Sequence, residues 1–293
     1  MNSEIDESLL GMTYGVKHPK EDMSEIGTAI QWIKEAERPV LLVGGGSINA
    51  NAGAEVVKLA EMIGAPAVFT LMGIGAMPTT HPLNMGPLGM HGRLCALDAF
   101  RNADLVIAIG TKFSDRTFSV HTRFGNKCRV VQIDIDATEF QKHGNMDINL
   151  LCDAKKGTQA LIDGLAGYKS NHAAWDLTYS EYKKKCQCNI DINETPIVPQ
   201  KILFELNKLI EKDHDMIVTT DVGQNQMWAM HYLEVHKPRH FLSSGSFGTM
   251  GFGLPSAIGA KSAKPDSTVV TITGDGGFQM VQQEQIGRAS CRE

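Results

Sequence analysis

The feature that most constrains the fold is a recurring apolar run that ends in glycine or aspartate. Three such runs are PVLLVGGG at 39–46, DLVIAIG at 104–110 and VVTITGDGG at 269–277. Strands that are buried on both faces have continuous apolar sequences of this kind. Patterns with helical spacing lie between them, and alternating strands and helices favour a parallel sheet covered on both faces. We therefore predict an α/β fold with two parallel-sheet units.

Apolar residues at helical spacing predict the helices, and glycine marks one helix end. Gly64 is expected to cap the second helix at its C-terminus. The expected helices lie near residues 26–36, 52–65, 96–103, 155–168, 198–212 and 224–233.

Changes in composition and periodicity divide the chain into a lead-in at 1–21, a central unit at 22–166, a linker at 167–196 and a second unit at 197–284, which is followed by residues 285–293. The linker is polar and without a clear period, so we expect some helix there. Its lysine run, 183–185, is predicted to be a solvated helix face.

Composition excludes several classes of protein. The net charge is −5, and no basic stripe favours nucleic acid. The six cysteines show no zinc-site spacing, which favours free thiols in a reduced cytoplasm. No apolar run is long enough to cross a membrane, and the acidic N-terminus has no signal-type apolar region.

Glycine loops after the first strands suggest a ligand crevice. VGGGSINANAG fails the dinucleotide fingerprint, because Asn49 stands where the third glycine belongs. The segment is then a glycine turn at the carboxyl end of a strand. Several such strand ends at one edge of a parallel sheet could line a crevice for an extended cofactor. Lys112 and Arg116 could bind phosphate or carboxylate there, or be exposed surface cations. His91 is expected to be a loop residue, since no metal-ligand partner lies nearby in the sequence.

Two loops of the second unit could hold an anion. Gln224, Asn225 and Gln226 follow a strand, and their amides could contact phosphate or form a polar helix start. GSFGTMGFGLPSAIGA, at 245–260, leads a glycine-rich backbone into a helix, whose N-terminus favours anions.

Asp275 follows the last apolar run on a predicted glycine turn. It could bind magnesium together with ligand phosphates, or occupy a type I′ hairpin turn. The continuous apolar strand before it argues for a parallel sheet, which favours the metal.

Seven segments in order resemble the thiamine diphosphate enzymes, and most closely the acetolactate synthase large subunits. The segments are PVLLVGGGSINA, LMGIGAMP, LGMHG, GTKFSDR, VGQNQMW, MGFGLPSAIGA and GDGGFQM. The family subunit has a pyrimidine-binding, an FAD-binding and a diphosphate-binding domain. This chain resembles the second domain and the first half of the third.

The resemblance implies a role for each matching position. FAD would be held by Gly44, Gly45, Thr70, Leu71, Met90, His91, Gly110, Lys112, Asp134 and Asp153. Thiamine diphosphate would be held by Gln224, Asn225, Gly248, Met250, Gly274 and Gly276, with Asp275 as the magnesium ligand. Met250 would buttress the cofactor, and Arg116 would recognise the carboxylate of the second substrate. Relatives often have His at the position of Asn225, so the contact of Asn225 with the diphosphate would differ from theirs. Many relatives have Arg and Asp at the positions of Lys112 and Ser114, so this chain would hold FAD less firmly.

The implied activity is decarboxylation of pyruvate and carboligation to a second 2-ketoacid, in branched-chain amino acid biosynthesis. A homodimer or higher oligomer and a regulatory small subunit are the implied partners. Alternatives are another thiamine diphosphate-dependent 2-oxo acid decarboxylase or carboligase, and a non-catalytic nucleotide-binding protein. The family's activating glutamate and a magnesium-binding Asn match nothing here, so we expect this chain to be inactive alone. IGRASCRE matches a translated sequencing adapter, so we expect 285–293 to be non-native.

Overall fold

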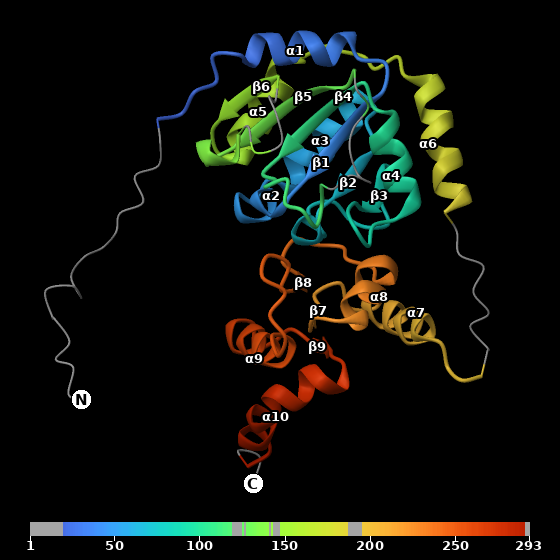
Figure 1. Cartoon of the computed structure of the whole chain (residues 1–293), viewed down its shortest axis with the longest axis vertical. Coiled ribbons are helices and arrows are strands. Elements are labelled where there is room, and N and C mark those ends of the chain that lie inside the picture. Colours follow the sequence, from blue (N-terminus) through green and yellow to red (C-terminus); the bar gives the residue numbers. More distant parts are fainter. Residues whose placement is uncertain are drawn as a thin grey trace, which may run out of the picture.

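The chain forms two α/β units, drawn one above the other in Figure 1. The computed structural model describes residues 20–118, 125, 127–140, 142, 147–186 and 195–290, without the side chains of 286–290. The tail predicted at 285–293 thus lies partly outside the described residues. The predicted α/β class with two parallel sheets is confirmed.

The first unit contains a six-stranded sheet in which every neighbouring pair is parallel. Its order is β3 (Asn84–Pro87), β2 (Ala67–Phe69), β1 (Pro39–Val43), β4 (Leu105–Ile109), β5 (Arg129–Asp134) and β6 (Ile148–Leu151). The two central strands, β1 and β4, are buried along their whole length.

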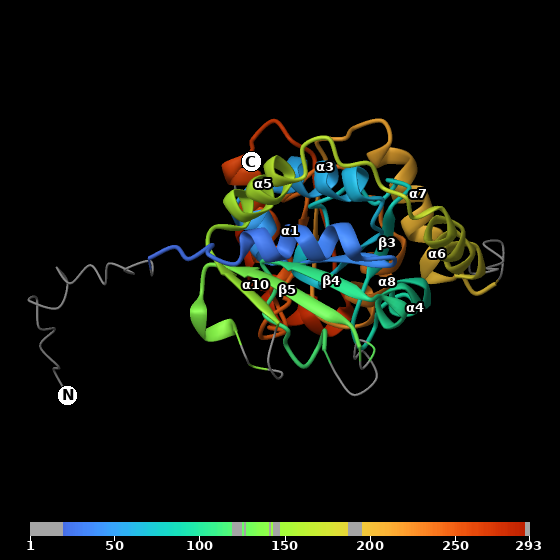
Figure 2. The ribbon, with the colours of Figure 1, turned by 90° about the horizontal axis from the view of Figure 1, so that it is seen from above.

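Helices cover both faces of this sheet (Figure 2). One face packs α1 (Ile26–Glu35), α3 (Gly53–Ile63) and α5 (Ala154–Gly164), and the other packs α4 (Leu94–Asn102) and α6 (Ala173–Lys185). Side chains alternate across β1: Leu41 belongs to the first apolar cluster and Leu42 to the second. Gly64 ends α3 in the left-handed conformation (φ 60°), as predicted.

The helix α6 packs firmly against the first unit. Its Trp175 is buried, and the indole N–H donates to the Pro39 carbonyl at 3.1 Å. The Lys183 ammonium is partly buried and donates to the carbonyls of His81 and Pro82. The prediction of a fully solvated lysine run was therefore wrong for Lys183, because packing of α6 on α4 brings this side chain onto the 81–82 loop.

The second unit contains a three-stranded parallel sheet in the order β8, β7, β9. Its elements are α7 (Pro199–Ile210), β7 (Ile217–Thr220), α8 (Gln224–Tyr232), β8 (Phe241–Leu242), α9 (Gly253–Ala263), β9 (Val269–Ile272) and α10 (Asp275–Ser290). Val281 interrupts α10 with non-helical backbone angles, so this helix is kinked.

The structure differs from the sequence analysis at several strands and turns. The strands β3, β6 and β8 were not predicted; all three are short edge strands, and β3 contains both Gly and Pro. Gly45 begins the short helix α2 (Gly45–Asn49), and Asp275 begins α10, where glycine turns were expected. Short 3₁₀ segments also follow β2 and β5, at Leu71–Gly73 and Ala137–Glu139.

A segment at 233–240 docks the second unit onto the first. Thr79 and Val235 exchange two hydrogen bonds: the Thr79 N–H donates to the Val235 carbonyl (3.0 Å), and the Val235 N–H donates to Thr79 Oγ1 (2.9 Å). The first apolar cluster continues from Leu41 into Leu203 and Val218 of the second unit. Among the described residues, no helix is long and apolar enough to cross a membrane.

Candidate functional site

A cavity of about 680 Å³ lies where the two units meet. Volumes of roughly 300–1,000 Å³ are typical of small-molecule sites. Its first wall is formed by the carboxyl ends of the central strands, the expected ligand edge of a parallel sheet. Its second wall comes from α8 and the 244–248 loop. Eight of the residues that the family resemblance assigned to FAD binding line this cavity: Gly45, Thr70, Leu71, Met90, His91, Gly110, Lys112 and Asp134.

Close backbone packing forms the floor of the cavity. The Gly46 N–H donates to the Gly110 carbonyl at 2.9 Å. A Cβ on Gly44 would lie 2.1 Å from that carbonyl oxygen, so only glycine fits there. Gly110 has a φ of 59°, which also favours glycine. Gly44 thus shapes the floor, although it does not itself line the cavity.

Two loops that are joined by a hydrogen bond form the opening of the cavity, and one of them contains the positively charged side chains that line it. The Met90 N–H donates to the Arg116 carbonyl at 2.9 Å. Phe113 is buried with a φ of 47°, a conformation that costs a side chain about 1–2 kcal/mol. Its ring meets Phe118 edge to face, which anchors the turn between Lys112 and Ser114. Lys112 and Arg116 are both exposed and line the cavity, so each can be a surface cation or face a ligand.

The wall formed by the strand ends is acidic after β5 and contains unsatisfied polar atoms. Burial raises the pKa of Asp134, and the neighbouring Glu139 carboxylate adds to this effect. Glu139 pairs with Lys142 through one oxygen, but its Oε2 is buried without a hydrogen-bond partner, as is Thr111 Oγ1. Buried polar atoms normally find partners, so this wall fits a ligand with several hydrogen-bonding groups.

A second region suited to anions lies at the carboxyl edge of the three-stranded sheet. There α8 and α9 begin without a side-chain cap, and α10 begins directly after β9. Open space surrounds Gly274 and Gly276, because a Cβ on either would meet no atom within 4 Å. Asp275 is exposed at this edge, and its carboxylate has no hydrogen bond or ion pair to the described residues. Helix N-termini and a free carboxylate fit a diphosphate and a hard cation.

Asp221 organises this edge, and the sequence analysis did not single it out. Its fully buried carboxylate accepts hydrogen bonds from the N–H groups of Val222 (2.8 Å), Gly251 (3.0 Å) and Gly253 (2.8 Å). A Cβ on Gly277 would lie 2.6 Å from Asp221 Oδ1, so α10 approaches it closely. An aspartate directly after an apolar strand, in TTDVG, was the available signal.

The amides after β7 act mainly within the protein. Asn225 donates through Nδ2 to the carbonyls of Asp221 (3.1 Å) and Ile272 (2.7 Å), joining the ends of β7 and β9. Gln226 donates to Ser243 Oγ at 2.7 Å and lines the cavity. Gln224 is the first residue of α8.

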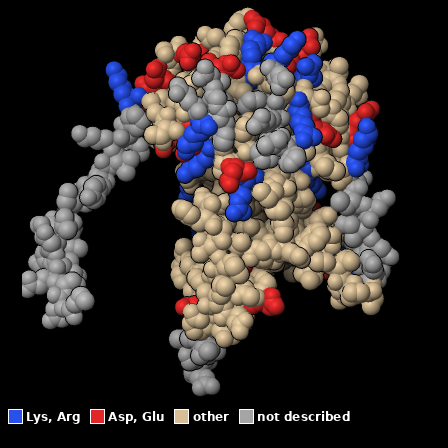
Figure 3. Space-filling model, viewed as in Figure 1, with Lys and Arg blue, Asp and Glu red and all other residues tan. Residues whose placement is uncertain are grey.

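The expected site residues therefore fall into two groups. Arg116 and Gly248 line the cavity with the FAD set, whereas Gln224, Asn225, Met250, Gly274, Asp275 and Gly276 do not. Asp153 caps α5, since its Oδ1 accepts from the N–H groups of Lys155 and Lys156. On the visible face in Figure 3, charged side chains gather over the first unit, and the second unit is largely uncharged.

Both units match known domains of one enzyme family. Residues 26–161 match the thiamine pyrophosphate enzyme central domain, and residues 221–290 match the C-terminal thiamine pyrophosphate-binding domain of the same enzymes. The chain belongs to the thiamine pyrophosphate (diphosphate) enzymes.

Among its relatives are acetolactate synthase large subunits. It is 42% identical over 282 residues to a probable acetolactate synthase large subunit of Methanococcus aeolicus, and 43% identical over 274 residues to one of Methanocaldococcus jannaschii. Each match covers 92% of this chain and 46% of the relative. It is 38% identical to the acetolactate synthase isozyme 3 large subunit of Escherichia coli, over 89% of this chain and 46% of that protein. The chain thus spans about half the length of these relatives.

Proposed function

We propose that this chain is part of an acetolactate synthase, which decarboxylates pyruvate and joins the remaining two-carbon unit to a second 2-ketoacid in branched-chain amino acid biosynthesis. The observation that carries the proposal is the convergence of helix N-termini and free Asp275 in the domain matched to thiamine pyrophosphate binding. The names of the relatives support the reaction. Free thiols at the described cysteines support a cytoplasmic location.

The second unit would hold thiamine diphosphate through its phosphates. Asp275 would bind Mg²⁺, and the N-termini of α8 and α10, with Gln224, Asn225, Gly274 and Gly276, would face the diphosphate. When bound, the cofactor supplies the electron sink that decarboxylation of a 2-ketoacid requires. Asp221 would keep the 251–253 backbone fixed beside it, and Gly248 and Met250 would orient the reactive ring.

The cavity between the units would hold FAD and one end of the substrate site. The unpaired oxygens of Thr111 and Glu139 would gain partners there, and Lys112 would face a phosphate. Arg116, at the mouth, would bind the carboxylate of the second 2-ketoacid. FAD would take no redox part in this reaction, so its role would be structural.

Exposed apolar side chains beside Asp275 support a partner subunit. Phe247 is 94% exposed, and Met250, Phe278 and Met280 are also exposed. Large apolar side chains gathered near a ligand edge favour an interface. We propose a homodimer or higher oligomer in the whole protein, with a regulatory small subunit as a further partner.

Cofactor binding by the 293-residue chain tests this proposal. We expect thiamine diphosphate with Mg²⁺ to raise the melting temperature of the wild type, and Asp275→Asn to abolish this rise. Asp266→Asn is the matched control, because Asp266 is also exposed but lies in the loop before β9. Binding of FAD with no effect of thiamine diphosphate would instead favour a nucleotide-binding protein.

Turnover is a separate test. We expect no acetolactate or acetoin from pyruvate with these 293 residues alone, because the family's activating glutamate has no counterpart among them. Robust turnover by this chain would refute that expectation. A panel of 2-oxo acids on the full-length gene product would distinguish acetolactate synthase from a related carboligase.

A further inference from the structure

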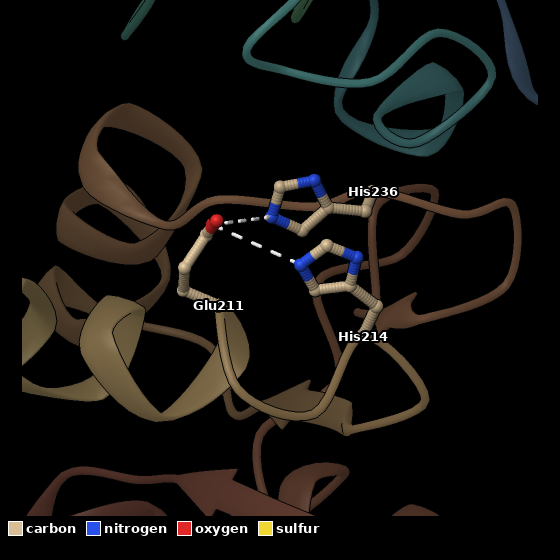
Figure 4. A group of neighbouring side chains, drawn as sticks. All are labelled: Glu211, His214 and His236. Atoms are coloured by element: carbon tan, nitrogen blue, oxygen red, sulfur yellow. Dashed lines mark ion pairs between the residues drawn. The ribbon is translucent and has the colours of Figure 1, made fainter.

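A group of potential metal ligands lies away from both sites described above. Figure 4 shows Glu211 after the end of α7, His214 in the turn that follows, and His236 in the 233–240 segment. One ligand atom from each side chain lies within 4.8 Å of the other two. Among the described residues, this is the group of three that could hold a metal ion.

The distances suit an ion placed between these groups. Glu211 Oε2 lies 3.8 Å from His214 Nε2 and 4.0 Å from His236 Nε2. These separations are too long for hydrogen bonds. Zinc bonds of about 2.0–2.1 Å hold neighbouring tetrahedral ligand atoms roughly 3.3 Å apart. For the two pairs that include Glu211, a contraction of roughly 0.5–0.7 Å would therefore reach that spacing.

His236 supplies an independent observation. Its Nε2 is buried without a hydrogen-bond partner, and its side chain is only 14% exposed. A second carboxylate oxygen, Glu234 Oε2, lies 3.8 Å from the same nitrogen. A buried unpaired nitrogen that faces two carboxylates is a good ligand for a cation.

One ring must turn before both histidines can share an ion. The two imidazoles are stacked, with centroids 4.3 Å apart and planes 9° apart, so their nitrogen lone pairs lie in nearly parallel planes and do not converge on one point between the rings. His214 is 46% exposed and Glu211 is 67% exposed, so both can move without disturbing the core. His236 would stay fixed and act as the anchor.

We propose that Glu211, His214 and His236 bind a divalent transition-metal ion of the zinc type. Imidazole and carboxylate ligands favour such an ion over magnesium, which prefers oxygen. The site joins the end of α7 to the segment that docks onto the first unit through Val235 and Thr79. Metal binding would therefore hold that docking segment in place.

Zinc titration of the full chain, without an affinity tag, tests the proposal. We expect the wild type to bind one more Zn²⁺ than His236→Ala, measured in competition with a chromophoric chelator. Glu211→Gln and His214→Gln should weaken binding at this site at least about tenfold. Both change exposed side chains, so they test the site even if His236→Ala does not fold. Co²⁺ should give visible absorption bands that His214→Gln weakens.

His240→Ala is the matched control. His240 is the last residue of the same 233–240 segment and faces Asp215 at 3.8 Å, outside the proposed ligand group. It should bind Zn²⁺ like the wild type, and so should Asp275→Asn, which separates this site from the proposed cofactor site. Equal zinc stoichiometry and affinity in the wild type, Glu211→Gln and His214→Gln would overturn the proposal.

Discussion

The two parallel sheets differ in how they are covered. In the six-stranded sheet, every residue of β1 and β4 is buried, whereas every residue of β9 in the three-stranded sheet is partly exposed. Apolar clusters pack on both faces of the first sheet. In the second, α9 buries only Gly253 and Leu254.

The second unit relies more on buried polar contacts. Thr219, Thr220 and Asp221 are fully buried at the end of β7. Thr219 Oγ1 donates to the Gly253 carbonyl at 2.9 Å, and Thr220 Oγ1 shares a 2.7 Å hydrogen bond with Ser243 Oγ. Most of the buried apolar side chains belong to the first unit, while the second unit concentrates buried hydrogen bonds at a ligand edge. We therefore expect the second unit to unfold first and to gain more from ligands.

The largest effect is expected from Leu41→Ala in β1. Leu41 is fully buried in the first apolar cluster, and such a truncation costs about 2–5 kcal/mol. Urea unfolding should be followed by thiol labelling of Cys95, Cys128 and Cys152, because residues 195–290 contain no cysteine. An unchanged midpoint of thiol exposure would contradict the role given to the first sheet.

Asp221→Asn should destabilise the second unit by about 1–3 kcal/mol. The amide group cannot accept all the hydrogen bonds of the carboxylate, so at least one buried N–H loses its partner. Hydrogen exchange should rise at 217–272 and stay unchanged at 39–109. Asp266→Asn changes an exposed residue and is the control. Equal protection from hydrogen exchange at 217–272 in both variants would contradict the claim that buried polar contacts of Asp221 stabilise the second unit.

A matched pair of valine truncations compares the sheets directly. Val43→Ala removes two buried methyl groups from β1 and should cost about 2 kcal/mol. Val270→Ala makes the same change in partly exposed β9 and should cost less than about 1 kcal/mol. Chemical denaturation of both variants gives the two values, and equal losses would show that β9 is covered as fully as β1.

The smallest effect concerns pH and the contact between units at His231. Its Nε2 hydrogen-bonds to the His91 carbonyl, and burial lowers its pKa below the usual 6.5, with Arg93 adding to this. The hydrogen bond to His91 and the Cys186 charge oppose that shift. The neutral ring is therefore the folded form. The contribution of neutral His231 to folding stability is therefore complete above pH 6.5, the usual pKa of an unfolded histidine. This contribution is lost as the pH falls through the lower pKa of His231 in the folded protein.

Melting temperatures at several pH values test this contribution. His231→Gln retains an N–H donor for the His91 carbonyl but cannot take up a proton. The variant should lose less stability than the wild type between pH 7.5 and about 5.5. The same pH dependence in both proteins would rule out His231 as its source.

Much of the candidate site followed from local sequence. Glycines after strands predicted the ligand edge, and Gly45 and Gly110 do line one cavity, together with Thr70, Met90 and Asp134, which the family resemblance had assigned to a cofactor. The buried carboxylate of Asp221 was missed, because its partners Gly251 and Gly253 approach it only when the glycine loop folds back over β7. That residues 285–293 are a non-native tail stays a prediction. The helix α10 and the match to the thiamine pyrophosphate-binding domain both extend into this segment, as far as residue 290.

The sequence alone determined the α/β class, the two parallel sheets and the glycine or polar residues after several of the strands, because these depend on local periodicity and glycine spacing. Only the tertiary structure decided that α6 packs on α4, that Lys183 is held by the 81–82 carbonyls and that Glu211, His214 and His236 meet. Those contacts join residues far apart in the chain, and their formation depends on packing that no local pattern encodes.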